Sequence, residues 1–139
     1  MISKNFRYSE FEHSDTANKY GIDNSIQDDN TKNAIKKLVL NVLQPLRDKY
    51  GKPININSGY RCPELNKKVG GVATSQHCKG EAADCGVPNP YELAKVAKEL
   101  DLPFDQMILY PGFVHFSHRT NGNQRKQILY NSGYKGKRL

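Results

Sequence analysis

The residues best suited to chemistry lie between Ser75 and Asp84. His77 and Asp84 are separated there by small residues that let the backbone fold closely around an ion. A second histidine, His115, lies in an alternating run of β-branched and aromatic residues, which predicts a strand that holds its imidazole rigidly. Two imidazoles and one carboxylate, with a fourth position left to water, are typical of a hydrolytic zinc centre, whereas structural zinc sites are usually closed by cysteines. We therefore predict that His77, Asp84 and His115 bind one zinc ion.

Motifs around these residues resemble the successive motifs of a known enzyme family. They are Ser58-Gly59-Tyr60-Arg61-Cys62-Pro63, Asn66, Gly70-Gly71, Ser75-x-His77-x-x-Gly80-x-Ala82-x-Asp84 and Phe113-Val114-His115-Phe116-Ser117. From Phe6 to about Arg119 the sequence resembles the zinc D-Ala-D-Ala peptidases, and most of all their small single-domain branch of bacterial cell-wall enzymes and phage endolysins. The resemblance implies the hedgehog-like fold of these peptidases, the same three zinc ligands, and substrate contact by Arg61.

The resemblance also implies an activity. It predicts a zinc metallopeptidase that hydrolyses peptide bonds in the stem peptides or cross-bridges of peptidoglycan, either as a D-Ala-D-Ala carboxypeptidase or as an endopeptidase. Bound zinc would lower the pKa of its water and polarise the scissile carbonyl, which are the two tasks that amide hydrolysis needs. A net charge of +7 favours the anionic cell wall as a partner.

Four residues are candidates for binding the substrate. The Arg61 guanidinium can hold a terminal carboxylate through two parallel hydrogen bonds. Ser75 and Gln76 are placed either to orient the substrate backbone or to support His77 from outside the ligand set. Tyr110 is a candidate donor to the developing oxyanion, although a tyrosine on a strand more often belongs to the core or its rim.

The general base is the main departure from the family pattern. In much of the family a glutamate or aspartate lies three residues before the last histidine, but here that position is Gly112. Asp105 is our first candidate for proton transfer, because strand pairing could return it to the metal cleft; a hydrogen-bonded carboxylate at a strand end is an equally good interpretation. Glu81 lies nearer in sequence, but its place between the ligands predicts that it points outwards.

Two other functions are consistent with the sequence. A non-catalytic cell-wall-binding module that retains the zinc pocket would account for Gly112. A nucleic-acid-binding protein with an incidental metal is suggested only by the net charge and the basic residues near Arg138. We favour the peptidase and expect no nucleic-acid partner.

The remaining cysteines and histidines are expected to lie outside the zinc site. Cys62, Cys78 and Cys85 form no C-x-x-C pair, which favours core packing over a metal-thiolate site and synthesis in a reducing compartment. His118 follows the last predicted ligand by three positions on a strand, so it should face the opposite side. His13 is isolated in the sequence and expected to be exposed.

Length and composition predict one domain over residues 1–139, with a monomer as the expected state and a flexible basic tail over 131–139. The sequence has no run of about 18 apolar residues, so we expect no membrane span. It also has no charged-then-apolar leader, so we expect no signal peptide. We therefore expect synthesis in the cytoplasm and action on the cell wall after delivery by another route, such as phage-mediated release.

Hydrophobic periodicity predicts an α+β fold with a small antiparallel sheet and flanking helices. Pro45 should bend the longest helix, and Gly51 should end it. The expected elements are a helix opened by a capping box at Ser9–Glu12, a loop over 17–26, a helix over 28–50, a strand over 54–58, a helix over 63–68, a strand over 82–87, a helix over 91–100, a strand pair over 104–110 and 113–119, and a strand candidate over 124–130.

Overall fold

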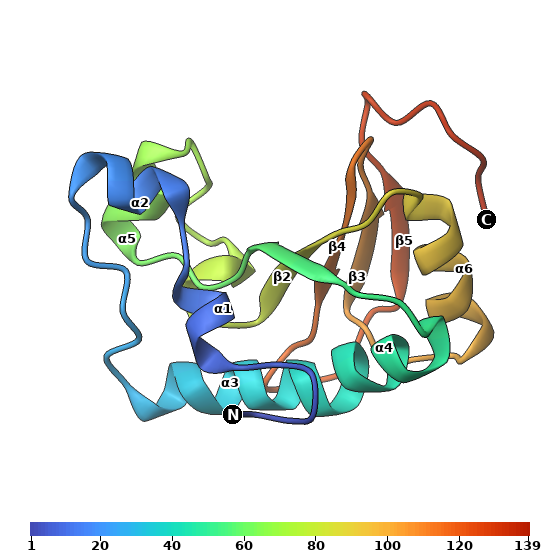
Figure 1. The fold of residues 1–139 in the computed structure, drawn as a ribbon, viewed down its shortest axis with the longest axis horizontal. Coiled ribbons are helices and arrows are strands. Elements are labelled where there is room, and N and C mark those ends of the chain that lie inside the picture. Colours follow the sequence, from blue (N-terminus) through green and yellow to red (C-terminus); the bar gives the residue numbers. More distant parts are fainter.

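Five strands form one sheet in the order β1-β2-β4-β3-β5 in the computed structural model, which describes residues 1–139 (Figure 1). The strands are β1 Asn55–Ser58, β2 Ala82–Gly86, β3 Gln106–Leu109, β4 Phe113–Ser117 and β5 Gln127–Tyr130. Strands β1, β2, β4 and β3 pair antiparallel, and the predicted pairing of β3 with β4 is confirmed. Strand β5 instead runs parallel to β3, because the connection 118–126 carries the chain past the start of β3. The α+β prediction is thus confirmed, with a sheet that is mostly rather than wholly antiparallel.

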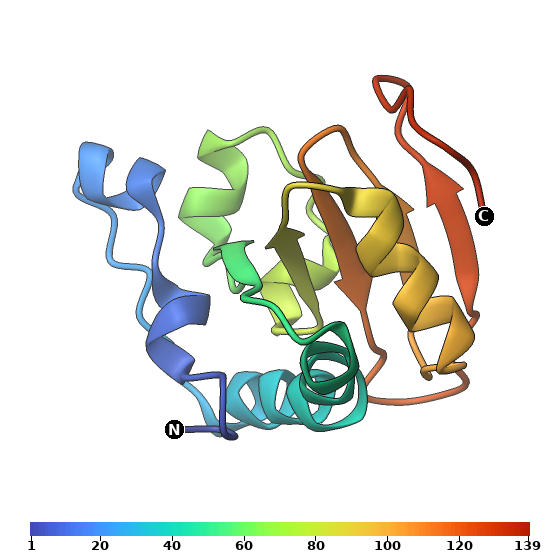
Figure 2. The ribbon, with the colours of Figure 1, turned by 45° about the vertical axis from the view of Figure 1, so that its right-hand side comes forward.

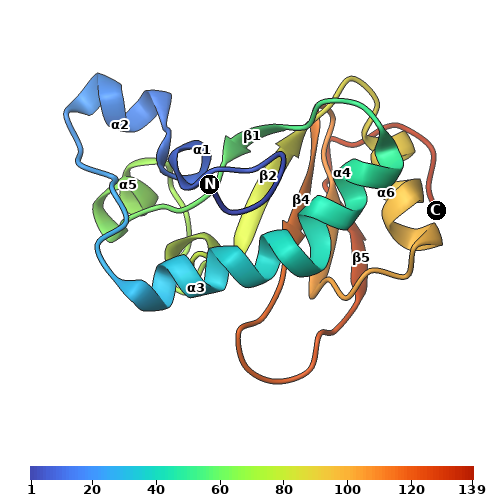
Figure 3. The ribbon, with the colours of Figure 1, turned by 60° about the horizontal axis from the view of Figure 1, so that its bottom comes forward.

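The helices are α1 Tyr8–Glu12, α2 Asp15–Tyr20, α3 Asp29–Leu38, α4 Gln44–Tyr50, α5 Pro63–Lys68 and α6 Pro90–Glu99. Of these, α3, α4 and α6 lie over one face of the sheet (Figures 2 and 3). Helices α4 and α6 contact each other, and α6 packs on β3 and β4 (Figures 2 and 3). At the other end of the molecule, α2 and α5 lie side by side, with the Lys68 ammonium 4.0 Å from the centre of the Tyr20 ring.

The long amphipathic helix forms as predicted, but Pro45 changes its winding. A π-helical turn, Val39–Leu43, joins α3 to α4, and the Gln44 N–H donates to the Val39 carbonyl five residues back. Proline has no N–H to continue the ordinary ladder, and a π-helical turn just before it accommodates the break without ending the helix. Gly51 ends α4 in the left-handed region, at φ 73°. The apolar face is completely buried, at Ile35, Leu38, Val39, Val42, Leu43 and Leu46.

The two faces of the sheet have different roles. One face consists of residues with no exposed surface that pack under the helices, namely Ala83, Cys85, Met107, Leu109, Val114 and Phe116. Successive side chains of a strand point to opposite faces, so Asp84, Ile108 and His115, which pair with one another across β2, β4 and β3, share the other face. The polar residues of interest therefore lie on the side of the sheet away from this core.

Two local expectations are corrected by the structure. Residues 17–20, the first part of the loop predicted over 17–26, belong to helix α2 instead, because the Ser14 side chain accepts the Ala17 N–H at 3.1 Å and caps the helix. Helix α1 begins at Tyr8 rather than after a Ser9 capping box, with Glu10 accepting the Arg7 N–H at 2.9 Å.

Residues 131–139 are expected to form a flexible basic tail. Tyr134 is buried in the core cluster, and the Leu139 N–H donates to the Tyr130 hydroxyl at 2.7 Å. The segment thus contacts the domain through these two residues, most of its other residues are exposed, and its flexibility stays a prediction. None of the helices has the length and apolar character needed to cross a bilayer.

Gly59 is required where α1 meets the segment after β1. A Cβ added there would lie 2.7 Å from the Cα of Phe11, and the neighbouring Tyr60 N–H donates to the Phe11 carbonyl at 2.8 Å. We predict that Gly59→Ala lowers the free energy of unfolding by about 1–3 kcal/mol, because two backbones must separate to admit the methyl group.

Urea unfolding measures this loss, and Gly112→Ala is the matched control. Gly112 is exposed and has no atom within 4 Å of an added Cβ, so its substitution should leave stability nearly unchanged. Equal stability of the two variants would contradict the close packing of α1 on this segment.

Candidate metal centre

The sheet brings two of the three predicted ligands together. Asp84 and His115 lie directly opposite each other on β2 and β4. Directly opposed side chains on antiparallel strands project from the same face. Consequently, the Asp84 Oδ1 lies 2.9 Å from the His115 Nδ1.

The third ligand comes from outside the sheet. His77 lies on a 3-10 turn, Gln76–Lys79, which Gly80 closes in the left-handed region at φ 76°. The His77 Nε2 lies 3.4 Å from the Asp84 Oδ1, and the two imidazole rings meet edge to face with centroids 5.1 Å apart. One donor atom from each of the three residues lies within 4.8 Å of the others. The structure thus gathers the predicted trio into one cluster.

The protonation of this cluster suits a cation. The His77 Nδ1 lies 2.7 Å from the Gly59 carbonyl oxygen, which can only accept, so Nδ1 carries the proton and Nε2 keeps a free lone pair. Burial raises the pKa of Asp84, but the neighbouring His115 and His77 side chains outweigh this effect and hold that pKa well below its usual value. A carboxylate with two imidazoles is a donor set that fits zinc.

A cleft of about 330 Å³ opens beside Asp84. Its walls come from the segment between α1 and α2 with the start of α2, the end of β1 with the residues that follow it, and α5 with the residue after it. The lining residues are His13, Ser14, Asp15, Thr16, Asn57, Ser58, Tyr60, Arg61, Leu65, Val69 and Asp84. A peptide seated in this cleft would therefore lie between Asp84 and the N-terminal segment.

His13 is a cleft residue that sequence reasoning missed. Its side chain is 60% exposed, as expected, but it faces the cleft with its Nε2 3.2 Å from the Asp15 carboxylate. The Asn24 side-chain amide donates to the Glu12 and Tyr60 carbonyls, each at 2.9 Å. It thereby holds the end of α1, next to His13, close to Tyr60, the residue before Arg61. No sequence pattern predicts this placement, because it depends on packing between distant segments.

Arg61 lies on the cleft with unused hydrogen-bonding capacity. Its backbone N–H donates to the His77 carbonyl at 3.1 Å, so the Arg61 backbone is hydrogen-bonded directly to a residue of the metal cluster. Its side-chain Nε is buried and has no hydrogen-bond partner. A guanidinium whose buried donor lacks a partner is suited to an anionic ligand such as a carboxylate.

Tyr110 lies at the end of β3, where its ring stacks on Phe113 with centroids 4.3 Å apart. Burial raises the pKa of its hydroxyl, and the negative charge of Asp84 raises it further. The hydroxyl therefore stays protonated at neutral pH and can donate a hydrogen bond. Its role towards an oxyanion stays a prediction.

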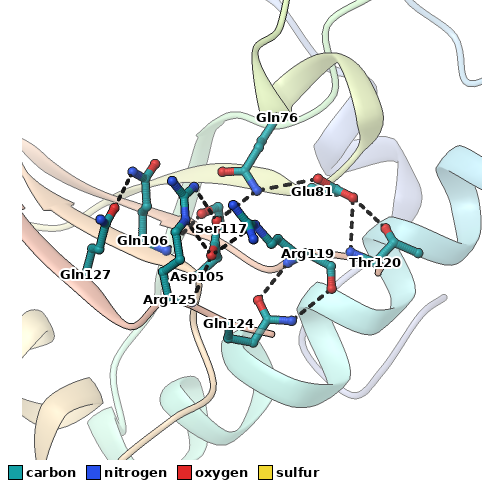
Figure 4. Close-up of polar contacts among 10 residues, drawn as sticks. All are labelled: Gln76, Glu81, Asp105, Gln106, Ser117, Arg119, Thr120, Gln124, Arg125 and Gln127. Atoms are coloured by element: carbon teal, nitrogen blue, oxygen red, sulfur yellow. Dashed lines mark hydrogen bonds and ion pairs between the residues drawn. The ribbon is translucent and has the colours of Figure 1, made fainter. Parts of the chain in front are cut away.

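Ser75 and Gln76 both support the turn that carries His77. The Ser75 hydroxyl accepts the His77 N–H at 3.2 Å. The Gln76 side-chain amide lies 3.2 Å from Asp105 and 3.4 Å from Glu81 (Figure 4). Of the two roles that the sequence left open, these contacts favour support of His77 over contact with the substrate.

Asp105 is held by arginines. It has no exposed surface, and Arg125 donates to both of its carboxylate oxygens, from Nε at 3.0 Å and from Nη2 at 2.7 Å (Figure 4). The Arg119 Nε lies 3.3 Å away. Burial raises the pKa of Asp105, but the hydrogen bonds and charges of the two arginines outweigh it and lower the pKa to about 2.

This geometry argues against the predicted role of Asp105 as general base, because its oxygens are already occupied and its proton affinity is low. The other interpretation, a hydrogen-bonded carboxylate at a strand end, fits better. Glu81 is likewise occupied, since it accepts from the Thr120 N–H at 3.0 Å and from its hydroxyl at 2.7 Å. The cysteines and His118 lie outside the metal cluster.

A family model described as Peptidase M15 matches residues 4–118, which include the three cluster residues, Arg61 and the segment that walls the cleft. The chain belongs to the peptidase M15 family. Within this M15 sequence, 86 residues are 34% identical to the zinc D-Ala-D-Ala carboxypeptidase of Streptomyces albus G. The match covers 60% of this chain and 34% of the relative, so it spans about a third of the relative's length. The resemblance to the zinc D-Ala-D-Ala peptidases is thereby confirmed, while the likeness to phage endolysins stays a prediction.

The ion pairs of Asp105 predict a pH dependence of stability. Its folded pKa of about 2 lies below the ordinary value of 3.8, so its contribution is present above that ordinary value and is lost as the pH falls towards 2. We expect Asp105→Asn to be less stable than the wild type at neutral pH, and the difference to shrink between pH 4 and pH 2 (about the two pKa values). Unfolding free energies measured across this range test it; a constant difference would contradict the assignment.

Proposed function

We propose that this protein is a zinc-dependent metallopeptidase that hydrolyses peptide bonds in the stem peptides or cross-bridges of peptidoglycan. The observation that carries the proposal is the convergence of donor atoms from His77, Asp84 and His115 within 4.8 Å, beside a cleft that Arg61 lines. Membership of the peptidase M15 family supports peptide hydrolysis as the reaction.

In this proposal the three cluster residues hold the ion. When bound, zinc supplies a Lewis acid for the scissile carbonyl and lowers the pKa of water. The Gly59 carbonyl keeps the His77 ring turned so that Nε2 faces the cluster. Arg61 binds a carboxylate of the peptide, and the Tyr110 hydroxyl donates to the carbonyl oxygen as it gains negative charge.

Proton transfer to the leaving amine needs another group, because Asp105 and Glu81 are engaged elsewhere and Gly112 has no side chain. We assign it to His13, which lines the cleft next to Asp15. An imidazole can both accept and donate a proton, and a neighbouring carboxylate can hold its ring in place.

The substrate class rests on charge and on the named relative. A D-Ala-D-Ala carboxypeptidase acts on a peptide that ends in a free carboxylate, which is the group that Arg61 is suited to bind. A net charge of +7 favours the anionic bacterial wall as the place of action. We propose that the protein acts there as a monomer, after synthesis in the cytoplasm and release by a separate mechanism such as phage lysis.

A non-catalytic wall-binding module is the second candidate function. It is favoured by one observation, that the carboxylates of Asp105 and Glu81 are occupied by hydrogen bonds while the family's usual acid is replaced by Gly112. Protein with one bound zinc that adheres to peptidoglycan but releases no product would support this module and contradict the peptidase.

We predict that zinc-loaded protein releases D-alanine or new amino groups from purified muropeptides, and that a chelator abolishes the release. His77→Ala should lose both zinc and activity, because two remaining protein ligands hold the ion poorly. Product analysis by mass spectrometry separates a carboxypeptidase from an endopeptidase. Normal turnover by the His77→Ala variant would exclude this centre as the active site.

We further predict that Arg61→Ala raises KM roughly 10-fold to 100-fold while zinc stays bound, because a charged hydrogen bond to the peptide carboxylate is lost. Arg61→Lys should recover part of the loss, since an ammonium keeps the charge but not the paired donors. Steady-state kinetics on a peptide ending in D-Ala-D-Ala measure both. Lys49→Ala, an exposed cation on α4, is the control and should behave like the wild type; an unchanged KM in Arg61→Ala would remove Arg61 from the site.

A further inference from the structure

The three cluster residues are held in place by different means. Asp84 and His115 are fixed by backbone pairing of β2 with β4. His77 lies on a 3-10 turn that belongs to no strand. Its distance from the other two residues must therefore be set by contacts that tie this turn to the sheet.

Side chains on both sides of His77 make such contacts. Just before it, the Gln76 amide donates to the Asp105 Oδ2 at 3.2 Å (Figure 4). Just after the turn, Glu81 accepts two hydrogen bonds from Thr120, and its carbonyl accepts the His118 N–H at 2.9 Å. The partners in these contacts lie beside two strands. Asp105 directly precedes β3, and His118 and Thr120 follow β4, the strand that carries His115.

Asp105 is a rigid anchor for the first tie. Its N–H donates to the Ser117 carbonyl at the end of β4 at 2.7 Å, and its own carbonyl accepts the Gln127 N–H at the start of β5 at 3.0 Å. Its carboxylate is held by the guanidinium and the backbone N–H of Arg125. A completely buried carboxylate with this many donors has little freedom to move.

We propose that Asp105 and Gln76 are positioning residues that set the zinc affinity of the centre, by holding the His77 turn against the end of the strand that carries His115. The inference rests on the zinc centre of the proposed function, but not on hydrolysis. Groups outside the ligand set that orient metal ligands typically change metal affinity 10-fold to 100-fold when they are removed (an approximate range).

The test compares two glutamine variants in the full chain. Gln76→Ala should raise the Kd for zinc about 10-fold to 100-fold, measured by competition with a chromophoric chelator. Gln106→Ala is the matched control, since Gln106 is equally half-buried and its amide donates to Gln127 at 2.9 Å, apart from the turn (Figure 4). It should leave the Kd unchanged. Without metal, Gln76→Ala and Gln106→Ala should unfold at similar temperatures. If Gln76 only stabilised the fold, Gln76→Ala would unfold at a lower temperature.

A double-variant cycle tests whether the effect passes through Asp105. Asp105→Asn should weaken zinc binding, and adding Gln76→Ala should then weaken it little further, because both changes break the same tie. Strictly additive losses, or a Gln76→Ala Kd equal to that of Gln106→Ala, would overturn the inference. Wild-type protein that binds zinc without hydrolysing peptides would contradict the proposed peptidase alone, whereas protein that binds no zinc would overturn both.

Discussion

The register between β2 and β4 is the constraint on which the rest of the site depends. Asp84 faces His115 because Ala83 faces Phe116 on the other side of the sheet, where neither residue has any exposed surface. A slip of one residue would move the polar pair into the core and bring the core residues out to water. Burial of apolar surface on one face thus sets the distance between a carboxylate and an imidazole on the other.

The half-buried Asp84 and the fully buried Asp105 are stabilised in different ways. Asp84 lies beside two imidazoles, whose ring nitrogens can also bind a cation. Asp105 is surrounded by guanidinium groups, which stay charged and keep it ionised as part of the scaffold. The side chains around each aspartate therefore distinguish a carboxylate suited to bind a metal ion from one that is part of the scaffold.

The cleft is built by a segment remote in sequence from the cluster. Backbone contact between Phe11 and Tyr60, made possible by Gly59, brings the connection between α1 and α2 next to Arg61. Asn24 extends this joint, since its side-chain oxygen also accepts the Cys62 N–H at 2.8 Å. The cleft residues thus come from the beginning and the middle of the segment that matches the M15 family, and correct packing of the N-terminal residues against Tyr60 is part of building the site.

The sequence by itself determined the helices, the strands and the candidate metal ligands that can be recognised from a local pattern of residues. The apolar spacing around Leu38 gave the long helix, alternation gave the strands that carry Asp84 and His115, and the residue types of the trio indicated a zinc centre. Each of these depends on neighbours a few positions away or on the chemistry of one side chain.

Only the tertiary structure decided which carboxylates are free and which segments border the cleft. Arg125 reaches Asp105 because β5 runs parallel to β3, a pairing that no local periodicity encodes. His13 lines the cleft because α1 docks beside Gly59, and Tyr134 brings a polar, glycine-rich segment back onto the core. Ion pairs and cleft walls depend on which distant segments pack together, and that is settled by burial of the whole core rather than by the residues nearby.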